Sequence, residues 1–336
     1  MKILIVAPAW IGDTVLAQPL FSSLHRRIPD LTLDVLSPRW VAPVLGRMAE
    51  VRRIIDSPFM HGELKLGARW QLAQQIKQER YDAAIVLPNS LKSALIPAFA
   101  GIPLRIGFTG EARYGLLNHR LTLDKHALPT MAERFSALAQ YWPAPQANQA
   151  ATEPSLRTSS EQQAQTISAL GLQRPPRLVI FCPGAEYGPA KRWPARHFAS
   201  LAKLLAQRGT DVWLLGSSKD KSIAEAIVDV AATSCRNLCG STSLEQAIDL
   251  IAAADAVVCN DSGLMHIAAA VGPPLCALYG SSSPGFTPPL STKAQVLSLN
   301  LECSPCFQRQ CPLSHFHCLE NLSAEQVLAR LPEKLQ

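Results

Sequence analysis

The sequence predicts an α/β protein built from two Rossmann-like, doubly wound halves. Short apolar runs, typical of strands buried on both faces of a parallel sheet, alternate with amphipathic segments of helical length. The alternation stops once and then restarts, and 336 residues exceed what most single hydrophobic cores hold. We therefore expect an N-terminal domain over residues 1–150, a linker region over 151–176 and a C-terminal domain over 177–336.

The first half carries five predicted strands and a helix after most of them. The expected strands are Lys2–Ala7, Leu31–Leu36, Val51–Ile55, Tyr81–Leu87 and Leu104–Phe108. One expected helix follows the first strand. The other expected helices are Glu63–Glu79, Asn89–Ala100 and Thr130–Tyr141. The residues from Pro143 to Ala150, and the Thr- and Ser-bearing run up to Ser160, lack apolar periodicity and indicate a linker.

The second half repeats the pattern. A short helix over Glu161–Leu170 precedes expected strands at Leu178–Cys182, Asp211–Leu215, Ala256–Cys259 and Leu275–Tyr279. The expected helices are Pro194–Gln207, Lys219–Ala232, Ser243–Ala253 and Gly263–Val271. In doubly wound sheets, ligands bind at the carboxyl ends of the strands. We therefore expect two such domains facing across a cleft that holds the ligands.

Composition excludes several classes of protein. Hydrophobic residues make up 48% of the chain and charged residues 17%, which is typical of a globular protein and not of a disordered one. The longest apolar stretch, Leu95–Leu104, contains Pro97 and Pro103 and is too short to span a bilayer. The apolar start of the chain is followed by Pro8 and Asp13 and predicts a strand, not a signal peptide. We expect a cytoplasmic protein whose nine cysteines are thiols.

The positive charge is concentrated in the first half. Residues 1–150 contain 17 Lys and Arg against 11 Asp and Glu, whereas residues 151–336 contain 15 of each. The excess is either a solvated surface or a surface that meets an anionic partner such as a membrane or a polyanionic lipid. No basic cluster with interleaved aromatic residues is present, so nucleic acid is the least favoured partner.

The stretch from Val257 to Val271 predicts a buried strand, a polar turn and a helix. Asn260, Asp261 and Ser262 can accept hydrogen bonds from the first N–H groups of that helix, and Gly263 permits close approach of a backbone or ligand. A helix N-terminus above a strand end suits a diphosphate. The turn is therefore a helix cap, a phosphate site or both.

A second polar turn, Pro183–Pro194, ends in Lys191 and Arg192. Two cations beside a positive helix terminus are unfavourable unless an anion joins them, so a phosphate site is favoured over a basic surface loop. In a third turn, Ser217 and Asp220 can hold sugar or ribose hydroxyls or simply cap a helix. The glycine fingerprints of dinucleotide-binding and P-loop proteins are missing from these turns.

In the first half, Gly12 and Asp13 follow the first strand. Asp13 is either a helix cap or a general base, because partial burial raises the pKa of a carboxylate. Candidates for an anion-binding acceptor site are the helix-capping segment at Asn89 and Lys92 and the arginines of later loops, of which Arg105 and Arg113 are the leading members.

The C-terminal segment carries Cys303, Cys306, Cys311 and Cys318 with two nearby histidines. A C-x-x-C pair followed by further Cys and His indicates a zinc site, although the spacing matches no standard finger. The prolines and Phe316 indicate instead a compact irregular loop. Both interpretations remain open at this stage.

Six segments resemble the lipopolysaccharide heptosyltransferases of glycosyltransferase family 9, and the likeness covers essentially the whole chain. They are Met1–Asp13, Pro88–Leu95, Phe99–Gly107, Arg113–Asn118, Cys182–Pro194 and Asn260–His266. The central segments are most similar to the type II branch, and the run PGAEYGPAKRW is highly specific. The Cys-rich tail looks more like that of other family members.

The resemblance implies a GT-B fold and an inverting transfer of L-glycero-D-manno-heptose from ADP-heptose to the first heptose of the Kdo-lipid A inner core. It implies no cofactor and no catalytic metal, and a peripheral location at the cytoplasmic face of the inner membrane. By position, Asp13 matches the base, Lys191 matches the diphosphate-binding lysine, and the donor loop is matched by Asp261, Ser262, Gly263, Leu264 and His266. From their places in the turns and loops, we add Arg192, Ser217 and Asp220 as donor candidates. The acceptor candidates are Gly12, Asn89, Lys92, Arg105 and Arg113. Type I or III activity, or non-catalytic nucleotide-sugar binding, are the alternatives.

Overall fold

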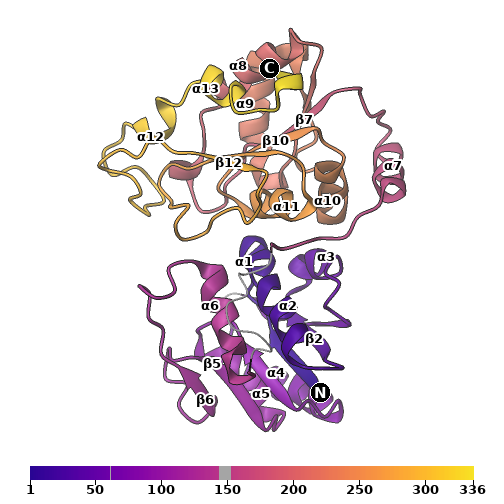
Figure 1. The fold of residues 1–336 in the computed structure, drawn as a ribbon, viewed down its shortest axis with the longest axis vertical. Helices are drawn as coiled ribbons and strands as arrows, with labels where there is room; N and C mark the ends of the chain where they lie inside the picture. The colour runs from indigo at the N-terminus through magenta and orange to yellow at the C-terminus, as the bar shows by residue number, and fades with distance from the viewer. Residues whose placement is uncertain (61, 144–152) are drawn as a thin grey trace. The chain divides into compact units, whose positions relative to one another are not determined.

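The chain folds into two compact units, Met1–Pro154 and Ser155–Gln336 (Figure 1). The structure, a computed structural model, describes residues 1–60, 62–143 and 153–336. Each unit contains one six-stranded sheet in which all paired strands are parallel. Two α/β units with parallel sheets are what the repeated alternation of strands and helices predicts.

The sheet of the first unit has the strand order β3-β2-β1-β4-β5-β6. Its strands are β1 (Lys2–Val6), β2 (Thr32–Ser37), β3 (Arg53–Asp56), β4 (Ala83–Val86), β5 (Leu104–Phe108) and β6 (His119–Leu121). The central strands β1 and β4 are almost entirely buried, as their unbroken apolar sequences predict. The chain runs outward on one side of β1 and then on the other, so the strand order reverses between β1 and β4.

Helices cover both faces of this first sheet. They are α1 (Ile11–Leu16), α2 (Gln18–Arg27), α3 (Ala42–Leu45), α4 (Leu66–Gln78), α5 (Leu91–Phe99) and α6 (Met131–Ala137), which continues as a 3-10 turn over Leu138–Tyr141. Leu4 and Val6 of β1 share one core cluster with Ile76 of α4 and Ile96 of α5. Alternate residues of a strand point to opposite faces, so α1, α2 and α6 lie over the other face (Figure 1).

The second sheet has the order β12-β11-β10-β7-β8-β9. Its strands are β7 (Leu178–Cys182), β8 (Asp211–Leu214), β9 (Arg236–Asn237), β10 (Ala256–Asn260), β11 (Leu275–Leu278) and β12 (Ala294–Leu297). Strands β7 and β10 are buried along their whole length. The reversal of strand order falls between these two strands.

The helices of the second unit are α7 (Ser160–Ala169), α8 (Ala195–Ala206), α9 (Lys221–Ala231), α10 (Leu244–Ala252), α11 (Gly263–Val271), α12 (His317–Glu320) and α13 (Ala324–Leu328). Phe198 of α8, Ile227 of α9 and Val327 of α13 join one core cluster against the sheet. Helices α7, α10 and α11 pack together on the opposite face (Figure 1).

The predicted linker, residues 151–176, needs correction. Its first two residues, like residues 144–150 before them, lie outside the described part, but from Ser155 onward the segment belongs to the second unit. The physical reason is a buried carboxylate. Asp249 of α10 accepts hydrogen bonds from Thr158 at 2.8 Å and from Thr166 of α7 at 3.0 Å, which ties α7 to the unit.

Smaller differences concern short elements. The helix predicted over Glu63–Glu79 begins at Leu66, because Lys65 has a left-handed backbone with φ of 40°. The edge strands β6, β9 and β12 were not predicted, because they are largely exposed and lack the apolar run of the buried strands. In the described ranges, no helix is long and apolar enough to cross a bilayer.

Candidate functional site

The carboxyl ends of β7 and β10 define the candidate site of the second unit. The two strands are adjacent and pair Cys182 with Cys259, so the segments that follow them leave the sheet side by side. Ligands of doubly wound sheets bind where the strand order reverses, which in this sheet is between β7 and β10. The two segments are Pro183–Trp193 and the turn at Asp261 and Ser262.

Asn260, the last residue of β10, holds both ends of the loop that follows β7. Its side chain is fully buried, accepts a hydrogen bond from the Trp193 backbone N–H at 3.0 Å and donates one to the Pro183 carbonyl at 2.7 Å. A buried amide with both halves paired fixes its partners firmly. Asn260 therefore sets the shape of the loop that carries Lys191.

Lys191 and Asp261 meet at this edge of the sheet. The Lys191 Nζ lies 2.5 Å from the Asp261 Oδ2, and the two side chains are 18% and 5% exposed. The same ammonium lies 5.1 Å from the ring centre of Tyr187, within range of a cation–π interaction. The structure thus brings together two residues that the sequence predicted separately as donor ligands.

The N-terminus of α11 lies directly after this pair. Ser262 is at the N-cap position, but its side chain makes no capping hydrogen bond; its hydroxyl is 3.5 Å from the Cys259 sulfur. Of the two roles that the sequence left open for this turn, helix cap and phosphate site, the capping bond from the Ser262 side chain is not formed. Ser262, Gly263 and Leu264 remain partly exposed. Free N–H groups and the positive end of the helix dipole at this point favour an anion.

His266 and Tyr279 form the buried floor beneath Asp261. Burial lowers the pKa of His266 to about 4, an effect that Asp261 opposes and Lys191 reinforces. Burial, together with the nearby Asp261 and Cys259, raises the pKa of Tyr279 well above its ordinary value. Both side chains are therefore neutral near pH 7 and add no charge to the site.

Three further predicted donor residues, Arg192, Ser217 and Asp220, make hydrogen bonds within their own turns. Arg192 donates to the carbonyl of Ala185 in its own loop at 3.2 and 3.3 Å. Asp220 accepts from the Ser217 backbone N–H at 2.9 Å and from its hydroxyl at 2.8 Å, which forms the capping box in front of α9. A Cβ on Gly184 would lie 2.4 Å from the Asp220 carboxylate, so Asp220 packs against the β7 loop.

Two hydroxyls at the end of β11 were not predicted. Ser281 and Ser282 are 1% and 5% exposed, and neither hydroxyl has a hydrogen-bond partner among the residues that the structure describes. The backbone N–H of Ser281 donates to the Ala190 carbonyl at 3.3 Å, which places this turn beside the Lys191 loop. Buried unpaired hydroxyls are uncommon and need a partner, so a ligand of the site is the natural candidate. Their position after a strand was a signal available in the sequence.

In the first unit, the equivalent edge is formed by the segments after β1 and β4. Asp13 is the third residue of α1, with Trp10 at the N-cap position, so Asp13 is not the cap of that helix. Gly12 and Asp13 are partly exposed, and an acidic residue in a first turn is stabilised by the helix dipole. The structure therefore places both residues at the carboxyl edge of the sheet.

Arg113 is buried at this edge rather than solvated. It is 1% exposed and donates to the Pro88 carbonyl at 2.7 Å, to the Asn89 Oδ1 at 3.2 Å and to the Phe108 carbonyl. It thereby joins the segments that follow β4 and β5. Burial lowers the pKa of the Arg113 guanidinium, against the attraction of Glu111.

The remaining acceptor candidates, Lys92 and Arg105, lie at different ends of the sheet strands. Lys92 is partly exposed in the first turn of α5, close to Asn89 in the chain. Arg105 is the second residue of β5, and its guanidinium donates to the carbonyls of Ile102 and Leu116 at 2.6 and 2.7 Å. The structure does not bring Arg105 to the edge that carries Asp13, since it lies near the opposite end of its strand.

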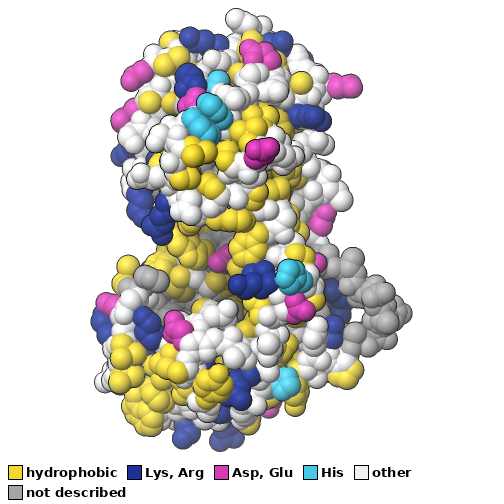
Figure 2. All heavy atoms as spheres, turned by 90° about the vertical axis from the view of Figure 1, so that its left-hand side faces the viewer, with side chains coloured by type: hydrophobic (Ala, Val, Ile, Leu, Met, Phe, Trp, Pro, Cys, Tyr) yellow, Lys and Arg dark blue, Asp and Glu magenta, His cyan; other side chains and the backbone are white. Residues whose placement is uncertain are grey.

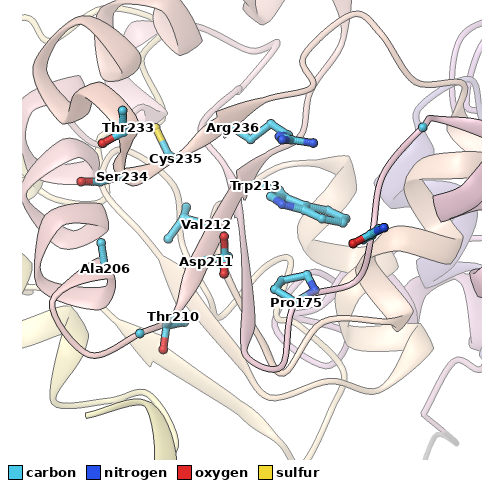
Figure 3. A pocket seen from close by; sticks show the side chains of 13 residues that line it. Pro175, Ala206, Thr210, Asp211, Val212, Trp213, Thr233, Ser234, Cys235 and Arg236 are labelled. Atoms are coloured by element: carbon cyan, nitrogen blue, oxygen red, sulfur yellow. The ribbon is translucent and has the colours of Figure 1, made fainter.

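A broad hollow of about 760 Å³ opens elsewhere on the second unit. Figure 3 shows Arg236, Trp213 and Pro175 along one side of it and Thr210 and Ser234 along the other. Thr210 precedes β8, Ser234 and Arg236 lie at the start of β9, and Pro175 precedes β7, whereas Trp213 is the third residue of β8. The hollow is therefore at the amino edge of the sheet, opposite the edge where doubly wound folds bind ligands.

Comparison with known proteins decides the family. Residues 69–317 match the family model described as glycosyltransferase family 9 (heptosyltransferase). The chain belongs to this family. It is accordingly a glycosyltransferase, and the two-domain α/β fold predicted from the resemblance is confirmed.

Relatives within family 9 cover most of the chain. It is 49% identical to lipopolysaccharide heptosyltransferase 2 of Escherichia coli (strain K12), over 89% of this chain and 88% of that protein. It is 47% identical to lipooligosaccharide heptosyltransferase 2 of Haemophilus influenzae, over 89% of each. The solved E. coli ADP-heptose LPS heptosyltransferase II superimposes with a TM-score of 0.88 at 43% identity, covering 100% of this chain and 98% of that one.

Proposed function

We propose that this family 9 enzyme transfers L-glycero-D-manno-heptose from ADP-heptose to the first heptose of the Kdo-lipid A inner core, in lipopolysaccharide core synthesis. Support comes from relatives named heptosyltransferase 2 at 46–49% identity. The observation that carries the proposal is the Lys191–Asp261 pair in front of the N-terminus of α11, because it provides an anion site beside a hydroxyl-binding carboxylate.

The donor diphosphate binds at this pair. An ammonium has three N–H donors, and Lys191 directs one of them to Asp261, which leaves two for phosphate oxygens. The free N–H groups of α11 supply further donors, so the charge that develops on the departing ADP is stabilised where it forms. Asp261 accepts hydrogen bonds from donor sugar hydroxyls while it keeps Lys191 in place.

Transfer proceeds by direct displacement with inversion. The acceptor hydroxyl loses its proton to the carboxylate of Asp13, and its oxygen forms a bond to the anomeric carbon of the heptose. The bond from that carbon to the β-phosphate oxygen breaks, and its electron pair leaves with ADP. A half-buried Asp13 at the carboxyl edge of the first sheet, in the first turn of α1, is consistent with this role.

The acceptor binds to the first unit at the cytoplasmic face of the inner membrane. The excess positive charge of residues 1–150 complements the Kdo carboxylates, the lipid A phosphates and an anionic membrane surface. Asn89 and Lys92, in the segment after β4, are the proposed acceptor ligands, and Arg113 donates to the Asn89 Oδ1 at 3.2 Å. The exposed amide of Asn89 and the partly exposed ammonium of Lys92 suit polar, anionic ligands.

Purified enzyme supplied with ADP-heptose and two acceptors tests the assignment. We expect rapid ADP release with Kdo-lipid A that carries one heptose and only background release with Kdo-lipid A that carries none. The reverse preference would assign type I activity. Failure to release ADP with either acceptor, despite binding of ADP-heptose, would support the non-catalytic alternative and contradict the proposal.

A further inference from the structure

Four cysteines of the C-terminal segment lie around one small cavity. Cys303, Cys306, Cys311 and Cys318 all line a space of about 20 Å³, next to His315. All four are free thiols. A volume of roughly 10–15 Å³ is enough for a single water-sized sphere, so this cavity is of the size of one ion and not of an organic ligand.

The segment around these cysteines has little apolar core of its own. Phe307 and Leu313 are 51% and 58% exposed, and no helix or strand is present from β12 to α12 in this described stretch. Within it, four non-glycine residues have left-handed backbones, namely Asn300, Phe307, Ser314 and Phe316. Such conformations persist only where the surroundings hold them. Something other than apolar packing must therefore fix this segment.

The backbone after Cys311 turns around its sulfur. Backbone N–H groups of Phe316, Leu313, His315 and Ser314 lie near the sulfur. Backbone N–H groups directed at a ligand atom help to orient it. The thiolate is the form of cysteine that binds metals.

We propose that Cys303, Cys306, Cys311 and Cys318 bind one metal ion through their four sulfurs. Zinc and iron are the ions that tetrahedral sulfur sites hold in proteins. Four thiolates in one cavity repel each other, and a dication offsets that repulsion. Among the described residues no three Cys, His, Asp or Glu side chains already form a metal-binding group, so the thiols turn towards the cavity on binding. All four are partly exposed.

This site is structural and supports the donor loop. The Arg309 carbonyl accepts from the Ala190 backbone N–H at 3.2 Å, and the Phe307 carbonyl accepts from the Tyr187 hydroxyl at 2.7 Å. A Cβ on Gly188 would lie 2.4 Å from the Arg309 carbonyl, so the two backbones are in close contact. Fixing residues 303–318 therefore fixes the loop from which Lys191 projects.

A metal ion can reach this site from solvent. Helix α12 is on the side of the second unit that faces the viewer in Figure 2, where histidine side chains show beside hydrophobic ones. His315 and His317 stack with ring centres 3.9 Å apart in this segment. The His317 backbone N–H donates to the His315 Nδ1 at 3.0 Å, so that nitrogen is already used and sulfur remains the expected ligand.

Elemental analysis of the full-length enzyme tests the proposal. The protein is purified without a metal-affinity tag, under reducing conditions, and desalted. We expect about one zinc or iron per chain. A colourless protein indicates zinc, whereas sulfur-to-iron absorption in the visible range indicates iron. Modification of the thiols with a mercurial should release all of the bound metal. This measurement needs neither a variant nor catalytic activity.

Matched variants locate the ligands. Cys311→Ser and Cys318→Ser should each lose most of the metal, while Cys235→Ser, a partly buried thiol outside the cluster, should retain it. If the cluster variants do not fold, the mercurial release from the unmodified enzyme still decides the question. Less than roughly a tenth of a metal ion per chain, both as purified and after anaerobic addition of zinc or iron(II), would overturn the proposal. So would metal that stays bound after all accessible thiols are modified.

Discussion

The Lys191 ammonium and the Asp261 carboxylate are in contact at 2.5 Å although 70 residues separate them in the chain. Their backbones come together because β7 and β10 are neighbours at the point where the strand order reverses. A buried cation next to an uncapped helix N-terminus is costly by itself, and Asp261 offsets that cost until a diphosphate arrives. The pair therefore keeps the anion site assembled in the absence of donor.

Replacing Asn260 should destabilise the enzyme and misplace the donor loop. Asn260→Ala removes two buried hydrogen bonds and leaves the Trp193 N–H and the Pro183 carbonyl unpaired, which costs about 1–3 kcal/mol. Urea unfolding should show this loss, and the KM for ADP-heptose should rise. Asn321→Ala, at an exposed asparagine of the same unit, should leave both values unchanged. An Asn260→Ala enzyme as stable as the parent would contradict the assigned role.

Removing the hydroxyl of Ser281 or Ser282 should raise the KM for ADP-heptose without lowering the free energy of unfolding. Within the described part of the chain neither hydroxyl has a hydrogen-bond partner, so Ser→Ala at either position should not lower the free energy of unfolding. If these hydroxyls contact the donor, the KM for ADP-heptose rises by about five- to tenfold. Ser136→Ala removes another buried unpaired hydroxyl, in α6 of the first unit, and should not change KM. An unchanged KM in both serine variants would show that the donor does not reach β11.

Asp13→Asn should abolish transfer without affecting donor binding. The amide keeps the size of the side chain but cannot accept the acceptor proton, and loss of a general base typically costs about 10²–10⁴ in rate. ADP affinity, measured by calorimetry, should stay within twofold of the parent value, since Asp13 belongs to the other unit. Asp56→Asn, which changes the exposed carboxylate of the last residue of β3, is the matched control. Transfer at the parental rate by Asp13→Asn would rule out the base assignment.

The buried His266 should make the enzyme sensitive to acid. Its pKa is lowered from 6.5 to about 4, so between these values the unfolded chain binds a proton that the folded chain does not. The contribution of neutral His266 to the free energy of unfolding is therefore fully present above pH 6.5. It is lost as the pH falls towards 4, which lowers the free energy of unfolding by on the order of 3 kcal/mol.

His266→Gln should reduce the dependence of the unfolding free energy on pH between 6.5 and 4. His197, whose pKa is also lowered by burial, contributes in the same direction, so His197→Gln reports the separate share of that residue. Unfolding free energies measured at several pH values between 4 and 7 provide the comparison. An equal slope in His266→Gln and the parent would show that His266 is not the group that titrates.

Local patterns predicted the sheet strands other than β6, β9 and β12, and they singled out Lys191 and Asp261 as candidate residues. Lys191 and Asp261 follow buried strands, and the doubly wound fold places such positions at one edge. Asn260 was noticed only as a possible cap, because its partners Trp193 and Pro183 lie far away in the sequence. Side-chain hydrogen bonds of that kind leave no local signal, so only the folded structure shows them.

The positions and hydrogen-bond partners of the arginines were the hardest features to predict from the sequence. Arg113 and Arg105 looked alike in the sequence, but Arg113 is buried at the carboxyl edge, whereas Arg105 ties down loop carbonyls near the start of β5. A guanidinium has five donors and serves equally as a ligand for an anion or as a link between carbonyls. Which task it performs depends on the register of its strand and on nearby loops, and the sequence specifies neither directly.

The affinity of Lys191→Ala for ADP tests the central claim most directly. If Lys191 holds the diphosphate, its loss removes a charged hydrogen bond worth about 1.5–3 kcal/mol, so calorimetry should show ADP binding weakened by about 10- to 100-fold. Lys219→Ala, an exposed lysine paired with Glu186 in the same unit, should bind ADP as the parent does. Equal ADP affinity in Lys191→Ala and the parent would contradict the account.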